Sequence, residues 1–165
     1  MDALSMVPLT LFLGKAAAAA GTTSTLTTTG TMVFGLRGKA VSRAAFTNQA
    51  TPTTDITTGA AFVAVAAGFG AVVVLGLDSA GTLRACQGPQ LTLDGIAAGA
   101  SASFIIAPQF PPIPDTVCPF AYVVVKVGTA GAAWTFGTSN LTGPPANTAI
   151  TFVDVVTMPD RPQVA

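Results

Sequence analysis

The chain has 165 residues, enough for one domain with a substantial core, and 50% of them are hydrophobic. Only 8% are charged, seven basic and seven acidic, against about 25% in ordinary soluble domains. With zero formal net charge and no histidine, the chain lacks the basic surface that nucleic-acid binding requires. So few charges indicate that partners cover much of the folded surface, because exposed apolar patches normally mark interaction sites.

Residues 1–30 are predicted to form an extended N-terminal arm, apolar at first and rich in threonine towards its end. Leu9 and Leu11 alternate with other residues as in an edge strand, and Pro8 opposes a helix. The alanine run at residues 16–20 favours a helix by propensity, but five residues are too few to recover the cost of nucleation.

A strand pattern begins at Thr31, where Met32, Phe34 and Leu36 alternate with other residues, and it continues after Gly38. Arg37, Lys39 and Arg43 all occupy odd-numbered positions, so a continuous strand would place them on one face. Two interpretations stay open at this stage: a patch that binds an acidic partner, or an ordinary solvated strand face.

The uncharged run at residues 56–77 is long enough to cross a bilayer, but its glycines and β-branched residues favour two strands. We expect strands at residues 60–66 and 71–77 around a turn at residues 68–70, and no membrane span. The sequence Asp78-Ser79-Ala80-Gly81 predicts a tight hairpin turn, with residues 82–87 as the returning strand and Leu91 in another short strand.

The stretch at residues 104–127 contains two strand-like runs, residues 104–106 and 121–127, separated by five prolines. Prolines cannot donate backbone hydrogen bonds and favour extended geometry in the preceding residue. The segment between the two runs is therefore predicted to be a stiff crossing that carries Phe110 and Ile113 outward.

Residues 128–131 predict another hairpin turn, and residues 133–136 a strand with Trp134 and Phe136 on one face. A last strand is expected at residues 148–156, followed by an extended tail at residues 158–165. The count of eight to ten short strands predicts an all-β protein, an antiparallel sandwich or barrel at residues 31–157 with little helix.

Chemical motifs are scarce in the sequence. The chain has no glutamate, and its two cysteines, Cys86 and Cys118, lack metal-ligand spacing, so we expect buried free thiols. Asp78, Asp94 and Asp115 each stand beside turn-forming residues, where aspartate commonly bonds its own backbone. We therefore predict no catalytic, metal or cofactor site, with an aspartate-based hydrolase as a minor alternative.

Three extended segments are candidates for partner binding: the N-terminal arm, the proline crossing and the C-terminal tail. Such segments gain order by lying on another subunit, although packing within the chain would serve equally well. Together with the basic strand positions, the predicted interface residues are Leu9, Leu11, Phe12, Arg37, Lys39, Arg43, Phe110, Pro111, Pro112, Ile113, Met158 and Pro159.

The chain resembles the small head decoration, or cement, proteins of tailed bacteriophages. The resemblance is carried by APQFPPIPDTVCPFAYVVVKVG at residues 107–128, WTFGTSNLTG at residues 134–143 and MPDRPQVA at residues 158–165. It implies a β-sandwich, jelly-roll or β-tulip-like module on the capsid exterior of the virion, made in the host cytoplasm and often trimeric, that ties neighbouring capsomers together. No functional residue can be carried over from the family.

The main hypothesis is therefore a non-enzymatic virion protein that stabilises a capsid by burying apolar surface against its own copies and the major capsid protein. The alternative is a receptor- or glycan-binding module of a phage tail fibre or a surface adhesin. Such a module needs an exposed aromatic ring, and Trp134 and Tyr122 are its strongest candidates.

Overall fold

The computed structural model describes residues 10–164, and every regular element in this range is a β-strand. The predicted all-β antiparallel sandwich is confirmed. The strands are β1 (Leu11–Phe12), β2 (Ala19–Ala20), β3 (Thr25–Thr27), β4 (Met32–Leu36), β5 (Lys39–Arg43), β6 (Gln49–Ala50), β7 (Phe69–Leu77), β8 (Leu83–Gln87), β9 (Leu91–Thr92), β10 (Cys118–Val127) and β11 (Thr148–Asp154).

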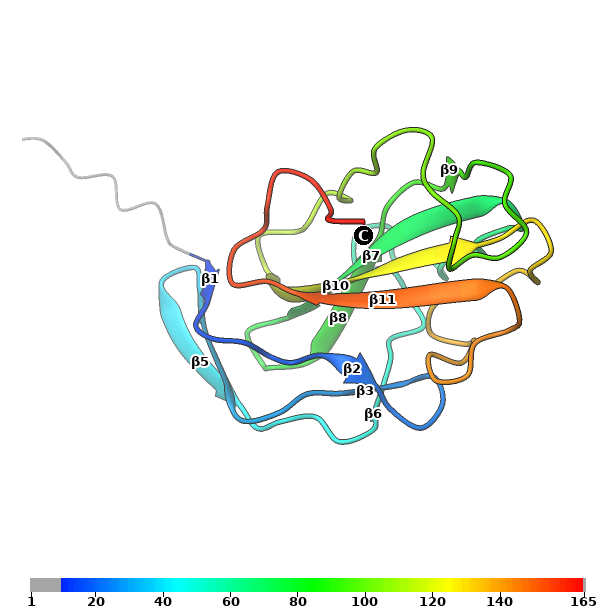
Figure 1. Ribbon diagram of the computed structural model, residues 1–165. Coiled ribbons are helices and arrows are strands. Elements are labelled where there is room, and N and C mark those ends of the chain that lie inside the picture. The colour runs from blue at the N-terminus through cyan, green and yellow to red at the C-terminus, as the bar shows by residue number, and fades with distance from the viewer. Residues whose placement is uncertain (1–9, 165) are drawn as a thin grey trace, which may run out of the picture.

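One large sheet and two small sheets make up the fold. The large sheet has the order β11-β10-β7-β8, with β9 paired to the start of β7. The small sheets have the orders β1-β4-β5 and β2-β3-β6, and all pairings are antiparallel. The long strands β7, β10 and β11 lie above β2, β3 and β6, while β5 forms one margin of the molecule (Figure 1).

The two central strands, β7 and β10, are buried on both faces. Their sequences, FGAVVVLGL and CPFAYVVVKV, read as continuous apolar runs, as expected for strands covered on both sides. The side chains of Val73 and Val123, which are paired across the strands, enter the main core between the large sheet and the small sheets. Val72 and Val124 enter a second, smaller cluster on the opposite face.

The prediction of an extended N-terminal arm at residues 1–30 is wrong for residues 10–30, the part that the structure describes. The side chains of Phe12 and Leu26 are 1% and 0% exposed and belong to the main core, with β1 paired to β4 and β3 to β6. Residues 10–30 are therefore part of the sandwich and not an arm beside it, because burying these side chains within the chain removes apolar surface from water. Leu9 lies outside the described residues.

The proline crossing does not carry Phe110 and Ile113 outward, as the sequence predicted. Both side chains are half-buried against the second cluster, and the Phe110 ring meets Tyr122 edge-on, with 5.1 Å between ring centroids. The hydroxyl of Thr57 also donates a hydrogen bond to the carbonyl of Pro112 at 2.9 Å. The crossing covers its own sheet because the apolar face around Tyr122 would otherwise be exposed.

Residues 60–66 do not form the predicted strand. Two glutamine side chains, and not a neighbouring strand, bond the backbone of this segment. Gln87 accepts a hydrogen bond from the amide of Val63 at 3.0 Å and donates one to its carbonyl at 2.9 Å. Gln90 bonds the amide of Ala66 and the carbonyl of Ala64 in the same way, at 3.2 and 2.6 Å. β7 accordingly begins at Phe69, where the sequence predicted a turn.

Two other predicted strands are reduced to single bridges. Phe104 bridges Leu93, while Ile105 and Ile106 are 65% and 66% exposed. In the predicted strand at residues 133–136, only Trp134 makes a bridge, and its partner is Val65. The turn after β10 is present, but β10 pairs with β11 and not with residues 133–136. Apolar residues alone therefore did not define strands where no partner strand lies beside them.

Candidate interaction surface

The small β1–β4–β5 sheet has one buried side and one exposed side. Phe12 and Phe34 are paired across β1 and β4 and point into the main core. The alternating residues point away from the core, and we call this set the outer face: Leu11, Leu13, Val33, Ala40 and Ser42.

The outer face is apolar at its centre and carries no charged side chain. Leu13 and Val33 are 55% and 37% exposed, and the Leu13 amide donates a hydrogen bond to the Val33 carbonyl at 2.8 Å, so the two residues are neighbours. Leu11 was predicted from the sequence as an interface residue, whereas Leu13, Val33, Ala40 and Ser42 were not. The signal was present, because alternation that turns Met32 and Phe34 inward leaves apolar Val33 on the outside.

A two-residue turn joins β4 to β5. Arg37 and Gly38 have φ angles of 50° and 77°, the pair of positive values that a type I′ hairpin turn requires. Arg37 therefore lies in the turn and not on a strand face, contrary to the prediction. Lys39 and Arg43 do lie on the same side of β5, together with Val41, as their spacing predicted.

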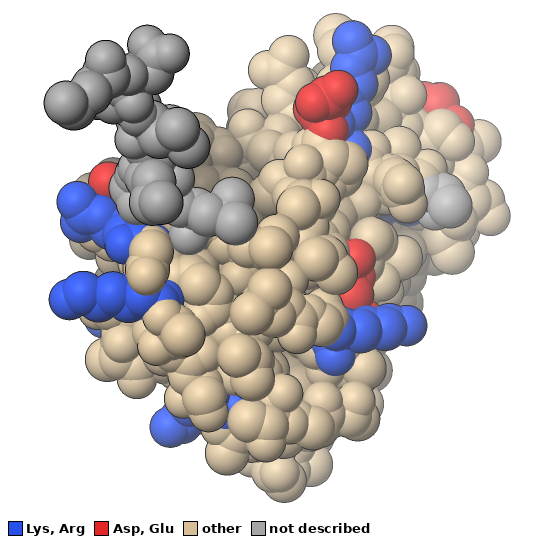
Figure 2. Space-filling model, turned by 90° about the vertical axis from the view of Figure 1, so that its left-hand side faces the viewer, with Lys and Arg blue, Asp and Glu red and all other residues tan. Residues whose placement is uncertain are grey.

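The basic side chains near this sheet have different environments. The guanidinium of Arg43 lies over the Phe46 ring, 5.5 Å from its centroid. Arg37 and Asp115 form an ion pair at 3.8 Å, but their side chains are 60% and 78% exposed, so water screens the attraction. Figure 2 shows that basic side chains are scattered over this side of the molecule and that uncharged residues cover most of it.

A pocket of about 340 Å³ opens at the end of this sheet, where three turns meet. The β4–β5 turn, the β7–β8 turn and the turn before β10 supply its lining, which is Leu36, Arg37, Lys39, Ser79 and Thr116. Two cations and two hydroxyl groups suit an anionic group such as a carboxylate, which would share Arg37 with Asp115.

The remaining predicted interface residues lie elsewhere on the molecule. Ile113 and Met158 line one shallow hollow of about 290 Å³ together with Phe12, so the structure brings together the crossing, the tail and β1. Pro159 is half-buried beside Tyr122, and Pro111 is buried. These segments pack mainly against their own domain, which is the alternative that the sequence left open.

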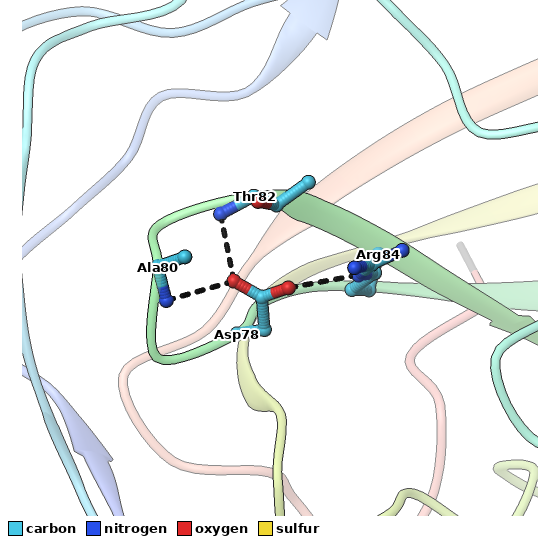
Figure 3. Close-up of polar contacts among 4 residues, drawn as sticks. All are labelled: Asp78, Ala80, Thr82 and Arg84. Atoms are coloured by element: carbon cyan, nitrogen blue, oxygen red, sulfur yellow. Dashed lines mark hydrogen bonds and ion pairs between the residues drawn. The ribbon is translucent and has the colours of Figure 1, made fainter.

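Asp78 and Asp94, two of the three aspartates predicted to stand in turns, accept hydrogen bonds within those turns. Asp78 accepts hydrogen bonds from the amides of Ala80 and Thr82 and from Nε of Arg84, each at 2.9 Å (Figure 3). Burial by itself would raise the pKa of Asp78, but these hydrogen bonds hold it below the ordinary value. Asp94 accepts a bond from the amide of Ile96 at 3.4 Å, so it also serves a turn.

Asp55 is the one buried aspartate among the described residues, and no pattern in the sequence singles it out. Its carboxylate accepts hydrogen bonds from the amides of Thr57 at 2.7 Å, Thr58 at 3.3 Å and Gln87 at 2.7 Å. A cavity of about 360 Å³ lies beside it. With both oxygens bonded to backbone amides, the carboxylate ties the end of β8 at Gln87 to the loop between β6 and β7.

The two cysteines are buried free thiols, as predicted. Burial raises the pKa of the Cys86 thiol to about 12, with a further contribution from the charge of Asp55. Burial also raises the pKa of Cys118 to about 11. A thiol is a nucleophile only as the thiolate, so neither cysteine is activated at neutral pH.

Neither aromatic ring proposed for glycan binding is exposed. Trp134 and Tyr122 are both 0% exposed. The indole Nε1 of Trp134 donates a hydrogen bond to the Asn140 carbonyl at 3.1 Å, and the Tyr122 hydroxyl accepts one from the Gln163 amide at 2.7 Å. The two rings are core residues with satisfied polar atoms, so neither offers a stacking platform.

Comparisons of the chain with protein-family models, curated proteins and solved structures find no match. Within residues 10–164, no three histidine, cysteine or acidic side chains are grouped as a metal site would need. The same range contains no helix of the length and apolarity that a membrane crossing requires.

Proposed function

We propose that the protein is a non-enzymatic structural protein of a tailed bacteriophage that decorates and stabilises the capsid. It would do so by burying the outer face of the β1–β4–β5 sheet against neighbouring copies and the major capsid protein. In this proposal the protein forms a homo-oligomer, with a trimer favoured, and sits on the capsid exterior after assembly in the host cytoplasm.

The observation that carries the proposal is the exposure of Leu13 and Val33 side by side on a sheet face without charge. Apolar neighbours on an open sheet face favour association, because water is released when another surface covers them. An interface that buries ~400 Å² of apolar area would contribute on the order of 10 kcal/mol before the costs of ordering are subtracted.

The charge content of the whole chain supports the same proposal. Charged residues make up 8% of the sequence, far below the level that keeps ordinary domains soluble as monomers. A structural subunit needs few surface charges because its neighbours cover it. The aspartates whose carboxylates are bonded within turns and loops, such as Asp55 and Asp78, also fit a structural role better than acid–base chemistry.

Particle stability is the direct test. Phage particles assembled with the wild-type protein should withstand higher temperature and internal pressure than particles that lack it. Val33→Asp places a charge at the centre of the outer face, so this variant should fail to protect the particles. Thr151→Asp, a matched change at an exposed position of β11, should protect them like the wild type. Equal resistance of particles with and without the protein would refute the proposal.

A further inference from the structure

The edge strand β5 has one side that no other strand covers. It pairs with β4 over its full length, and it stands at the margin of the molecule (Figure 1). Among the described residues, no backbone group outside β4 bonds to residues 39–43. An open edge of this kind is a template on which another extended chain can add as a strand.

The hairpin register shows which backbone groups of β5 are available. In a two-residue hairpin, the pair that closes the turn exchanges hydrogen bonds, and here that pair is Leu36 and Lys39. Because bonded pairs alternate along antiparallel strands, Val41 and Arg43 also direct their backbone groups to β4. Ala40 and Ser42 therefore direct theirs to the open edge, and their side chains belong to the outer face.

Two cations flank these available groups. Lys39 and Arg43 are four residues apart on one side of β5, which corresponds to a spacing of about 13 Å in a strand. Lys39 also lines the pocket where Arg37 and two hydroxyl groups meet. A strand added to this edge would experience a positive side chain near each of its ends.

These charges disfavour a second copy of the chain as the added strand. An antiparallel pairing of two β5 strands that uses both Ala40 and Ser42 of each copy places Val41 opposite Val41. Lys39 of each copy then stands opposite Arg43 of the other, and like charges directly opposite each other destabilise a sheet. The edge is suited to a strand of opposite charge.

We propose that β5 is a docking strand for an extended acidic segment of a partner protein. The segment would pair antiparallel with Ala40 and Ser42 and carry two acidic side chains four residues apart. One carboxylate would face Arg43, and the other would face Lys39 and enter the pocket beside Arg37. This inference rests on the proposed function, in which the partner is the shell protein, and it names the kind of contact that the shell would make.

The test uses the full chain and a pair of blocked peptides, Thr-Glu-Thr-Val-Thr-Glu-Thr and the same peptide with lysine in place of glutamate. Amide resonances in a nuclear magnetic resonance titration report the contact. The glutamate peptide should shift the amides of Ala40 and Ser42, with an affinity that falls as salt is added, and the lysine peptide should not.

Two variants and a control sharpen the result. Lys39→Glu replaces an attraction by a repulsion and should weaken binding roughly tenfold. Ser42→Pro removes one outward donor without removing a bond to β4, and it should abolish binding. Lys15→Glu makes the same charge change at an exposed position just after β1, which β4 separates from β5, and should bind within about twofold of the wild type.

The inference is overturned if both peptides bind equally, or if neither shifts the amides of Ala40 and Ser42. Its failure differs from failure of the proposed function, which is judged by protection of particles through Leu13 and Val33. A protein that protects particles but ignores the acidic peptide would disprove only the docking strand.

Discussion

Replacing Tyr122 by phenylalanine removes a single oxygen atom that ties the C-terminal tail to the second cluster. The hydroxyl accepts a hydrogen bond from the Gln163 amide at 2.7 Å and lies 3.5 Å from the Gln163 carbonyl, while the ring is fully buried. A neutral hydrogen bond of this kind contributes about 0.5–1.5 kcal/mol. The lower part of that range applies here, because Gln163 is exposed and its freed amide can bond water.

The variant should therefore unfold at lower denaturant concentration, with a loss of about 0.5–1 kcal/mol, or about 1–4 °C in melting temperature for a domain of this size. Hydrogen exchange at residues 158–164 should increase more than exchange in β7. Gln163→Ala keeps the backbone amide and is the matched control, so its stability should equal that of the wild type. Unchanged exchange of the tail in Tyr122→Phe would refute the reasoning that this hydroxyl holds the tail on its own domain.

Three other predictions concern Gln87, Asp78 and the two cysteines. Gln87→Ala removes two hydrogen bonds to Val63 and should cost about 1–3 kcal/mol, with faster proteolysis of residues 60–66 as the readout. The pKa of Asp78 is lowered in the folded chain, so its contribution to stability is present above the ordinary value of 3.8 and lost as pH falls below it. Acid titration of Asp78→Asn should accordingly show a shallower loss of stability below about pH 4 than the wild type. Cys86 and Cys118 should resist a thiol reagent at pH 8 in the native protein and react on unfolding, whereas rapid native labelling would contradict their burial.

Local patterns predicted the strands whose partners are near in sequence or whose apolar runs are long. The alternation at Met32, Phe34 and Leu36 defined β4, and the turn at residues 78–81 joined β7 to β8 as expected. The run at residues 121–127 became the core of β10. In each case the residues that specify the element lie within it or beside it.

The wrong predictions concern segments whose structure depends on contacts with residues distant in the chain. Residues 60–66 have a strand-like composition, but the side chains of Gln87 and Gln90 satisfy their backbone instead of a neighbouring strand. The proline crossing looked like a docking arm, but the apolar face around Tyr122 holds it. Neither partner can be inferred from the segment itself, because single-sequence patterns do not specify which distant residue lies nearby.

The candidate interaction surface was predictable in part. Leu11, Lys39 and Arg43 were identified and do lie on the β1–β4–β5 sheet. Phe12 was also identified but is buried, because alternation along β1 turns Phe12 inward and Leu11 outward. Assigning the outer face required knowing which strands β4 pairs with, and the sequence did not specify the pairing of β1 with β4.

The most direct test of the account is sedimentation of the purified chain over a wide range of concentration, together with Val33→Asp. We expect the wild type to sediment as a multi-copy species, with a trimer favoured, and a charge in place of Val33 to shift it towards the monomer. A wild-type chain that remains monomeric at high concentration, with no change caused by Val33→Asp, would contradict the claim that neighbours bury the outer face.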